Sequence, residues 1–277
     1  MKNLLVVLML AISINIFAQD SDSLFNKGME LMQNKKYVES ITYFKKHLQN
    51  NPNDILAYDA IGATYVEMKL YDRAMENFEK SIAIDSNNAM GYSSRGAMYL
   101  LFNQKDKAEK DLVKSLELNP KNITAYISLA AVYITSDRSE KGFEIFDKAL
   151  EVDPNAVDVY TNRAAVYLNN DEYEKALSDV NKTIELQPNV AKNYYFRGTI
   201  YKDMKLYDKS MKDYDKAMQL DPNDGDLYVR RGILYLKLEN YKKAVDDMEY
   251  GYKLSPELKE QTADYYKEAV DKLKIKN

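Results

Sequence analysis

Residues 191–224 read AKNYYFRGTIYKDMKLYDKSMKDYDKAMQLDPND, and residues 89–122 repeat the pattern as AMGYSSRGAMYLLFNQKDKAEKDLVKSLELNPKN. In both stretches apolar residues recur twice at helical spacing, and a polar turn separates the two runs. The pattern returns every 34 residues, and every proline of the chain lies on this grid, at Pro52, Pro120, Pro154, Pro188, Pro222 and Pro256. A fixed period of this length indicates an array of helical hairpins rather than a domain with a single core.

Two columns of tyrosine keep the same period. The first is Tyr58, Tyr92, Tyr126, Tyr160, Tyr194 and Tyr228, and the second is Tyr65, Tyr99, Tyr133, Tyr167, Tyr201 and Tyr235. A buried tyrosine removes about 150–250 Å² from water, which stabilises a fold by several kcal/mol at about 25 cal/mol per Å². We therefore interpret both columns as core.

A third column consists of small residues within the first helix of each hairpin. It contains Gly28, Gly62, Gly96, Gly198 and Gly232, and alanine takes the two remaining positions at Ala130 and Ala164. Because glycine inside a helix costs about 0.5–1 kcal/mol relative to alanine, its repetition predicts close approach of the second helix. The proline column usually follows Asp or Asn, as in Asp153-Pro154. This pattern predicts a capped helix start with proline at the first helical position.

These columns resemble the tetratricopeptide repeat family. The family pattern is matched in residues 55–88 by Tyr58, Ile61, Gly62, Tyr65, Ala74, Phe78 and, at the proline position, Ser86. The resemblance implies an all-α, right-handed α-solenoid of seven tandem helix-turn-helix repeats, at residues 21–54, 55–88, 89–122, 123–156, 157–190, 191–224 and 225–258. Residues 259–277 are expected to form one C-terminal capping helix, with an apolar side made of Leu258, Tyr265, Tyr266, Ala269, Val270 and Leu273.

The first residues, MKNLLVVLMLAISINIFAQD, combine Lys2, an apolar run from Leu4 to Phe17 and the small residue Ala18. This pattern predicts a secretory signal peptide over residues 1–18, cleaved after Ala18. The mature chain is then expected in the periplasm or outside the cell, without a membrane span. An uncleaved membrane anchor and a cytosolic chain are the alternatives.

Arginine and aspartate are correlated between repeats. Four repeats have an arginine just before the small residue, and the same four have an aspartate sixteen residues later. The pairs are Arg95 with Asp111, Arg163 with Asp179, Arg197 with Asp213, and Arg231 with Asp247. Sixteen residues lead to about the same level of the returning helix, so the correlation predicts an ion pair inside each of these hairpins.

Residues of the kinds that carry catalysis are sparse. With 39 basic and 43 acidic residues the chain lacks the basic excess of a nucleic-acid binder. It has no cysteine, and a lone His47 among small residues at equivalent positions is expected to pack rather than to bind zinc. No phosphate-binding loop or nucleophile motif is found in the sequence. We expect a non-enzymatic protein without a cofactor or a metal.

In the family that the chain resembles, residues two, five, nine and twelve of each repeat tend to face a concave groove. In the first four repeats these positions are mostly apolar, which suits a bound peptide or helix; candidates are Phe25, Met29, Met32 and Ile127. The alternative is that the ninth and twelfth residues pack between neighbouring repeats. In the last three repeats the groove becomes polar, with candidates Lys192, Tyr195, Phe196, Lys202 and Arg230. Tyr195 and Phe196 lie outside the tyrosine columns and are expected to be exposed anchors.

The sequence thus predicts an exported scaffold or adaptor that binds protein or peptide segments in its groove. The alternative is a periplasmic component that holds a glycan or small molecule in the polar part of that groove.

Overall fold

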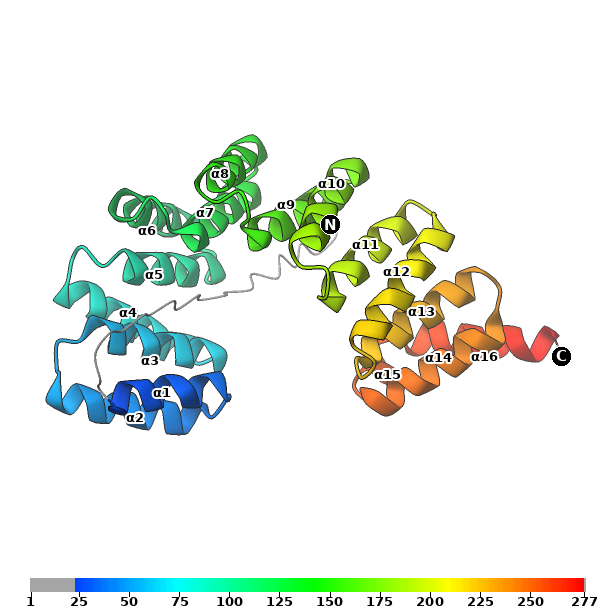
Figure 1. The fold of residues 1–277 in the computed structure, drawn as a ribbon, viewed down its shortest axis with the longest axis horizontal. Coiled ribbons are helices and arrows are strands. Elements are labelled where there is room, and N and C mark those ends of the chain that lie inside the picture. Colours follow the sequence, from blue (N-terminus) through cyan, green and yellow to red (C-terminus); the bar gives the residue numbers. More distant parts are fainter. Residues whose placement is uncertain (1–22, 277) are drawn as a thin grey trace. The chain divides into compact units, whose positions relative to one another are not determined.

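The computed structural model describes residues 23–276, and throughout this range the regular structure is helical (Figure 1). The predicted signal peptide, residues 1–18, lies outside the described residues. Antiparallel helices follow one another with the predicted period. Their bounds are α1 Ser23–Gln33, α2 Tyr37–Asn50, α3 Ile55–Glu67, α4 Tyr71–Ile84, α5 Ala89–Leu101, α6 Lys105–Leu118, α7 Ile123–Thr135, α8 Ser139–Val152, α9 Val157–Asn169, α10 Tyr173–Leu186, α11 Ala191–Asp203, α12 Tyr207–Leu220, α13 Gly225–Lys237, α14 Tyr241–Leu254, α15 Leu258–Gln261 and α16 Ala263–Lys276.

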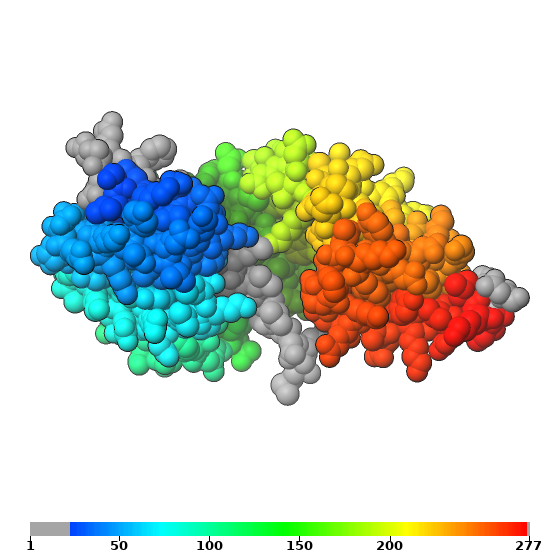
Figure 2. Space-filling model, turned by 90° about the horizontal axis from the view of Figure 1, so that it is seen from below, coloured from blue at the N-terminus to red at the C-terminus, as the bar shows by residue number. Residues whose placement is uncertain are grey.

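The chain divides into two compact units between Val159 and Tyr160, here called the N-terminal and the C-terminal unit. Inside the N-terminal unit each hairpin packs on the next, and the first helices α1, α3, α5 and α7 also touch in succession. Figure 2 shows this packing as a continuous surface, where the blue atoms of the first hairpin meet the cyan atoms of the following ones. In the C-terminal unit α10 packs on α11, α12 on α13, and α16 on α14.

The close approach predicted at the glycine column is confirmed. A Cβ atom on Gly62 would lie 2.5 Å from the Phe78 ring, and one on Gly28 would lie 2.6 Å from the Phe44 ring. The same conflict with the second helix arises at Gly96, Gly198 and Gly232. Atoms this close overlap, so these hairpins close tightly because their first helix lacks a side chain there.

The prolines do not begin helices, contrary to the prediction. Pro154 lies in the turn after α8, and α9 begins three residues later at Val157. The Asp153 side chain accepts a hydrogen bond from the Asn155 backbone N–H at 2.9 Å and so closes the turn instead of capping the helix. The caps come just before the next helix, where Asp54, Asn88, Asn122 and Asp224 accept from the first amides of α3, α5, α7 and α13.

Each first helix is followed, within two residues, by a residue in the left-handed conformation that is not glycine. The seven residues have φ between 56° and 60° and are Lys35, Lys69, Asn103, Asp137, Asp171, Lys205 and Glu239. At Lys69 its own amide bonds to the Val66 carbonyl and the next amide bonds to the Tyr65 carbonyl, both at 2.9 Å. These backbone bonds close the end of the helix in a conformation that Asn and Asp adopt more readily than Lys or Glu.

The C-terminal cap is two helices rather than one. Thr262 separates α15 from α16, and its side chain lies 2.8 Å from the Tyr252 hydroxyl and donates to the Leu258 carbonyl at 2.8 Å. This hydroxyl contact joins the break between the two helices to α14. On α16, Tyr265 is 42% exposed, so its assignment to the apolar side was wrong, while Ala269 is buried in the core.

A charged residue is buried between the second and third repeats. Asp59 on α3 is 3% exposed, and its Oδ2 accepts from Asn88 Nδ2 at 2.8 Å. Its Oδ1 has no hydrogen-bond partner within residues 23–276. Burial raises the pKa of the Asp59 carboxyl from 3.8 to about 6, because the charged form loses water that the protein does not fully replace.

We predict that Asp59→Asn stabilises the protein at neutral pH. With a raised folded-state pKa, the folded protein binds a proton between about pH 4 and pH 6 that the unfolded chain has lost, so this group's contribution to stability falls as pH rises through that window. Removing the charge should stabilise by about 1–3 kcal/mol above pH 7. Urea unfolding of both proteins at pH 5 and pH 7.5 measures this, and the difference between the two proteins isolates the contribution of the Asp59 carboxyl. An equal pH dependence in both proteins would contradict it.

Candidate functional site

All four arginine–aspartate pairs expected from the sequence are present. Arg163 Nε and Nη2 donate to the two Asp179 carboxylate oxygens, both at 2.8 Å. Arg95, Arg197 and Arg231 make the same two-bond contact with their aspartates at distances between 2.6 and 3.0 Å. These hydrogen bonds raise the pKa of the Arg95, Arg197 and Arg231 side chains.

The arginines also contact the tyrosine columns. The Arg95 guanidinium lies 5.5 Å from the Tyr92 ring centre and 5.7 Å from that of Tyr99, and Arg197 and Arg231 contact both of their tyrosines in the same way. Most of these tyrosines are only partly buried, Tyr65 being a buried exception. The columns are therefore less deeply buried than the core interpretation predicted, and cations cover part of their surface.

In the C-terminal unit the arginines also join neighbouring repeats. Arg197 Nη1 donates to Asn181 Oδ1 at 2.8 Å, and Arg231 Nη1 donates to Asp215 Oδ1 at 2.7 Å. Each acceptor belongs to the second helix of the preceding repeat. These contacts were not predicted, although the sequence has a polar acceptor sixteen residues before each of these two arginines. Each guanidinium thus ties two second helices together.

We predict that Arg163 and Asp179 are energetically coupled. Arg163 is 15% and Asp179 is 6% exposed, so either residue alone would leave a mostly buried charge without its partner. Arg163→Ala or Asp179→Ala should destabilise by about 1–3 kcal/mol, and the double variant by less than the sum. A double-mutant cycle from urea unfolding measures the coupling, and Lys242→Ala, which removes an exposed ion pair, serves as the control. Strict additivity would refute the coupling.

A partly accessible apolar row follows the first helices of the N-terminal unit. We call it the first-helix face, and its accessible members are Met29, Met32, Leu56, Met90, Leu100, Ile127 and Ile134. Phe25 does not belong to it, because it is 6% exposed and packs against Phe44 at 5.4 Å between ring centres. The alternative was that the ninth and twelfth residues pack between neighbouring repeats. Burial of the ninth residues Ala63, Ala97 and Ala131 and of the twelfth residue Val66 favours it at these positions.

Tyr195 and Phe196 are not the exposed anchors that were expected. Tyr195 stacks on Tyr214 at 6.0 Å, and burial raises the pKa of its hydroxyl to about 12. Phe196 packs on the buried core around Ile200. Tyr195 is covered by the second helix of its own repeat, and Phe196 packs on a cluster that includes Ala176 and Val180 of the preceding repeat.

Three other polar candidates remain at the surface on α11 and α13. Lys192 is exposed, Lys202 pairs with Asp203 at 3.0 Å, and Arg230 pairs with Asp226 at 3.1 Å.

We predict that Tyr195→Ala destabilises the protein by about 2–3 kcal/mol, because it removes a stacked and partly buried ring. Tyr265→Ala provides the control, since that ring is 42% exposed. Thermal unfolding measures both variants. An unchanged melting temperature for Tyr195→Ala would restore the anchor interpretation.

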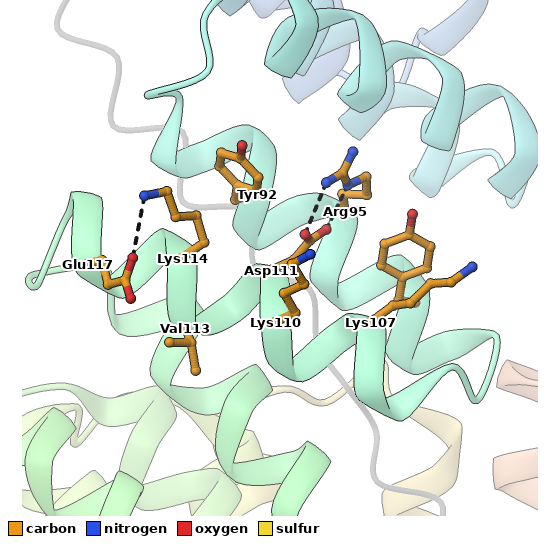
Figure 3. A pocket seen from close by; sticks show the side chains of 9 residues that line it. Tyr92, Arg95, Lys107, Lys110, Asp111, Val113, Lys114 and Glu117 are labelled. Carbon is orange, nitrogen blue, oxygen red and sulfur yellow. Dashed lines mark hydrogen bonds and ion pairs between the residues drawn. The ribbon is translucent and has the colours of Figure 1, made fainter.

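A pocket of about 750 Å³ lies on the other side of α5, between α5 and α6 (Figure 3). Tyr92, Arg95 and Tyr99 line it from α5, and Lys107, Lys110 and Lys114 line it from α6. Sequence analysis missed this site. Its signal was three lysines at positions i, i+3 and i+7, which share one helix face.

Residues 23–276 contain no helix long and apolar enough to cross a membrane. Within the same range, His, Asp and Glu side chains form no group of three that could hold a metal ion.

Comparison with known proteins identifies the repeat. Family models described as tetratricopeptide repeat match residues 21–54, 55–88, 91–122, 123–156, 145–178, 191–224 and 213–246. The chain therefore belongs to the tetratricopeptide repeat family, and the all-α solenoid fold predicted from the sequence is confirmed. Proteins of this family are generally non-enzymatic scaffolds that bind peptides or proteins.

Solved structures show the same fold at low identity. A tetratricopeptide repeat protein from Parabacteroides merdae is 20% identical with a TM-score of 0.64, covering 90% of this chain and 98% of its own. Yeast Tom70 is 18% identical with a TM-score of 0.66, over 95% of this chain and 67% of its own. A chain of the APC/C hetero-tetramer Cut9-Hcn1 is 15% identical with a TM-score of 0.69 over 91% of this chain, which spans about half (49%) of that longer chain. No curated protein sequence matches significantly.

Proposed function

We propose that this protein is an exported, non-enzymatic scaffold or adaptor that binds segments of other proteins on its first-helix face. The observation that carries the proposal is the row of partly accessible Met, Leu and Ile side chains on α1, α3, α5 and α7. Apolar side chains left accessible along adjacent helices suit the apolar side of an amphipathic helix or an extended peptide.

The chemistry of the row favours a protein segment over a small molecule. Met29, Met32 and Met90 are flexible and polarizable, so they can repack around different apolar side chains.

No observation favours the glycan or small-molecule alternative. That alternative needed Tyr195 and Phe196 exposed beside a pocket, as aromatic platforms for a ligand. Both rings are packed against other residues of the C-terminal unit. Of the surface candidates near them, Lys202 and Arg230 are already in ion pairs with Asp203 and Asp226.

Export rests on the sequence of residues 1–18 alone, whose pattern is that of a signal peptide. Expression in a bacterium with a periplasm, followed by intact-mass measurement of the periplasmic fraction, tests this part. A mass that begins at Gln19 supports export, and a chain that keeps Met1 in the membrane or cytosolic fraction contradicts it.

The binding part is tested with peptides selected from a random library on the purified chain. We expect selected peptides with apolar residues at helical spacing, and an affinity about tenfold weaker for the variant Met90→Gln with Leu100→Gln. Both residues are partly exposed, so the variant should fold. Lys80→Gln with Lys148→Gln, on second helices, is the control and should bind as the natural chain does. Peptides whose affinity is equal for all three proteins would contradict the proposed surface.

A further inference from the structure

The pocket between α5 and α6 holds three lysines, and several of the acidic side chains near them are already bound by other residues. Arg95 is bound by Asp111, and Lys114 is 3.4 Å from Glu117 (Figure 3). Two further acids lie on α6. Glu109 points to the next repeat, where it accepts from the Tyr133 hydroxyl at 3.0 Å and from Arg138 at 2.7 Å. Asp106, in the first turn of α6, forms no ion pair with a lysine of the pocket within residues 23–276.

Two lysines of the pocket are therefore left without an acid. Lys107 lies over the Tyr99 ring at 5.3 Å, and no carboxylate within residues 23–276 pairs with it or with Lys110. In a chain with a net charge of −4, this is a local excess of positive charge.

The same arrangement recurs in the C-terminal unit. Helix α12 has Lys209, Lys212 and Lys216 at the same spacing. Lys209 lies over the Tyr201 ring at 5.4 Å, and Lys216 lies over the Tyr194 ring at 6.0 Å. Two of the three acids of this helix, Asp213 and Asp215, are bound by arginines, as Asp111 is on α6. The third, Asp208, lies at the position that Asp106 has on α6. In the other second helices the middle position holds Thr42, Glu76, Glu144, Ser178 or Asp246.

We infer that these two lysine–tyrosine sites, the pocket on α5 and α6 and the equivalent surface on α11 and α12, bind acidic peptide segments of partner proteins. The three lysines of each helix extend over seven residues, which is about 10 Å along the axis. Charges spread over this length match several carboxylates along a peptide better than one compact phosphate. Arginine forks, which suit phosphate, are occupied by Asp111 and Asp213.

The tyrosines do not offer the open faces that a sugar or a nucleic-acid base needs for stacking. The Tyr99 ring carries two cations, Arg95 at 5.7 Å and Lys107 at 5.3 Å. Tyr201 is covered in the same way by Arg197 and Lys209. The rings hold the cations in place, and the free lysine ammonium groups recognise the carboxylates.

This surface is separate from the first-helix face. Tyr92, Arg95 and Tyr99 follow one side of α5, while Met90 and Leu100 follow the other, since residues three to four apart share a side of a helix. The inference goes beyond the proposed function, and the two can fail independently.

The test measures binding of a fluorescein-labelled peptide of alternating glutamate and serine, by anisotropy and by titration calorimetry. The natural chain should bind two such peptides, more weakly as salt rises, and should not bind the counterpart with glutamine in place of glutamate. Lys110→Glu with Lys212→Glu should lower the affinity about tenfold or more. The control Lys80→Glu with Lys148→Glu makes the same change in net charge on second helices that have glutamate instead of lysine at the middle position. It should bind as the natural chain does.

A third variant should gain a site. The fifth repeat has Tyr160, Tyr167, Lys175 and Lys182 together with the Arg163–Asp179 pair. It departs from the pattern at Ser178, and its Lys175 pairs with Glu172 at 2.6 Å, whereas Lys107 has no acid partner within residues 23–276. Ser178 is exposed, so Ser178→Lys should raise the number of bound peptides from two to three.

Several results would overturn the inference. These are equal losses in the control and the Lys110→Glu variant, binding of the glutamine peptide, an unchanged number of sites in Ser178→Lys, or displacement by inorganic phosphate or a polyuronate at lower concentration than by the peptide. The variant Met90→Gln with Leu100→Gln should bind the acidic peptide normally, which separates this result from failure of the proposed function.

Discussion

The contact between a glycine on the first helix and a large side chain on the second sets the geometry of most hairpins. Phe44, Phe78 and Tyr214 each lie where the glycine Cβ would have been, and all three are almost fully buried. Where alanine replaces glycine, at Ala130 and Ala164, the second helix still presents a buried side chain, Phe146 or Val180. One tight point per hairpin fixes the rotation of both helices. Their outer surfaces are then determined by the helical period.

Rotation fixed in this way gives each first helix two sides with different roles. On α5, one side holds Tyr92, Arg95 and Tyr99 against the second helix and its lysines. The other side faces the first helices of neighbouring repeats, where small buried residues alternate with larger, partly exposed ones. The ion pairs follow from the same constraint, because an aspartate sixteen residues after the arginine returns to its level only when the hairpin closes tightly.

Repetition is what made the fold and the ion pairs predictable from one sequence. Seven copies in the same phase act as an internal alignment. Some repeats have both an arginine and an aspartate at these positions, as in Arg163 with Asp179, and the others have neither, so the pattern had the force of covariation. Features that occur once lacked this support. Thr262 interrupts the cap through a bond to Tyr252, and Tyr195 is covered because Tyr214 stands where other repeats have Phe, Leu, Val or Met. Proline was misplaced because its Asp or Asn neighbour closes a turn instead of capping a helix.

Partners on opposite sides of one helix have a consequence for a scaffold. A segment held on the first-helix face and an acidic segment held in the α5–α6 pocket would share α5 without sharing a residue, since Met90 and Leu100 lie on one side and Tyr92 and Tyr99 on the other. If both segments belong to one partner, binding of the first raises the effective concentration of the second, and the combined affinity exceeds either alone. If they belong to two partners, the rigid hairpin fixes the distance between them. In both cases the glycine contact keeps the two surfaces in a constant relation, because a rotation of α5 about its axis would bring a neighbouring side chain against Leu112, where only Gly96 leaves room.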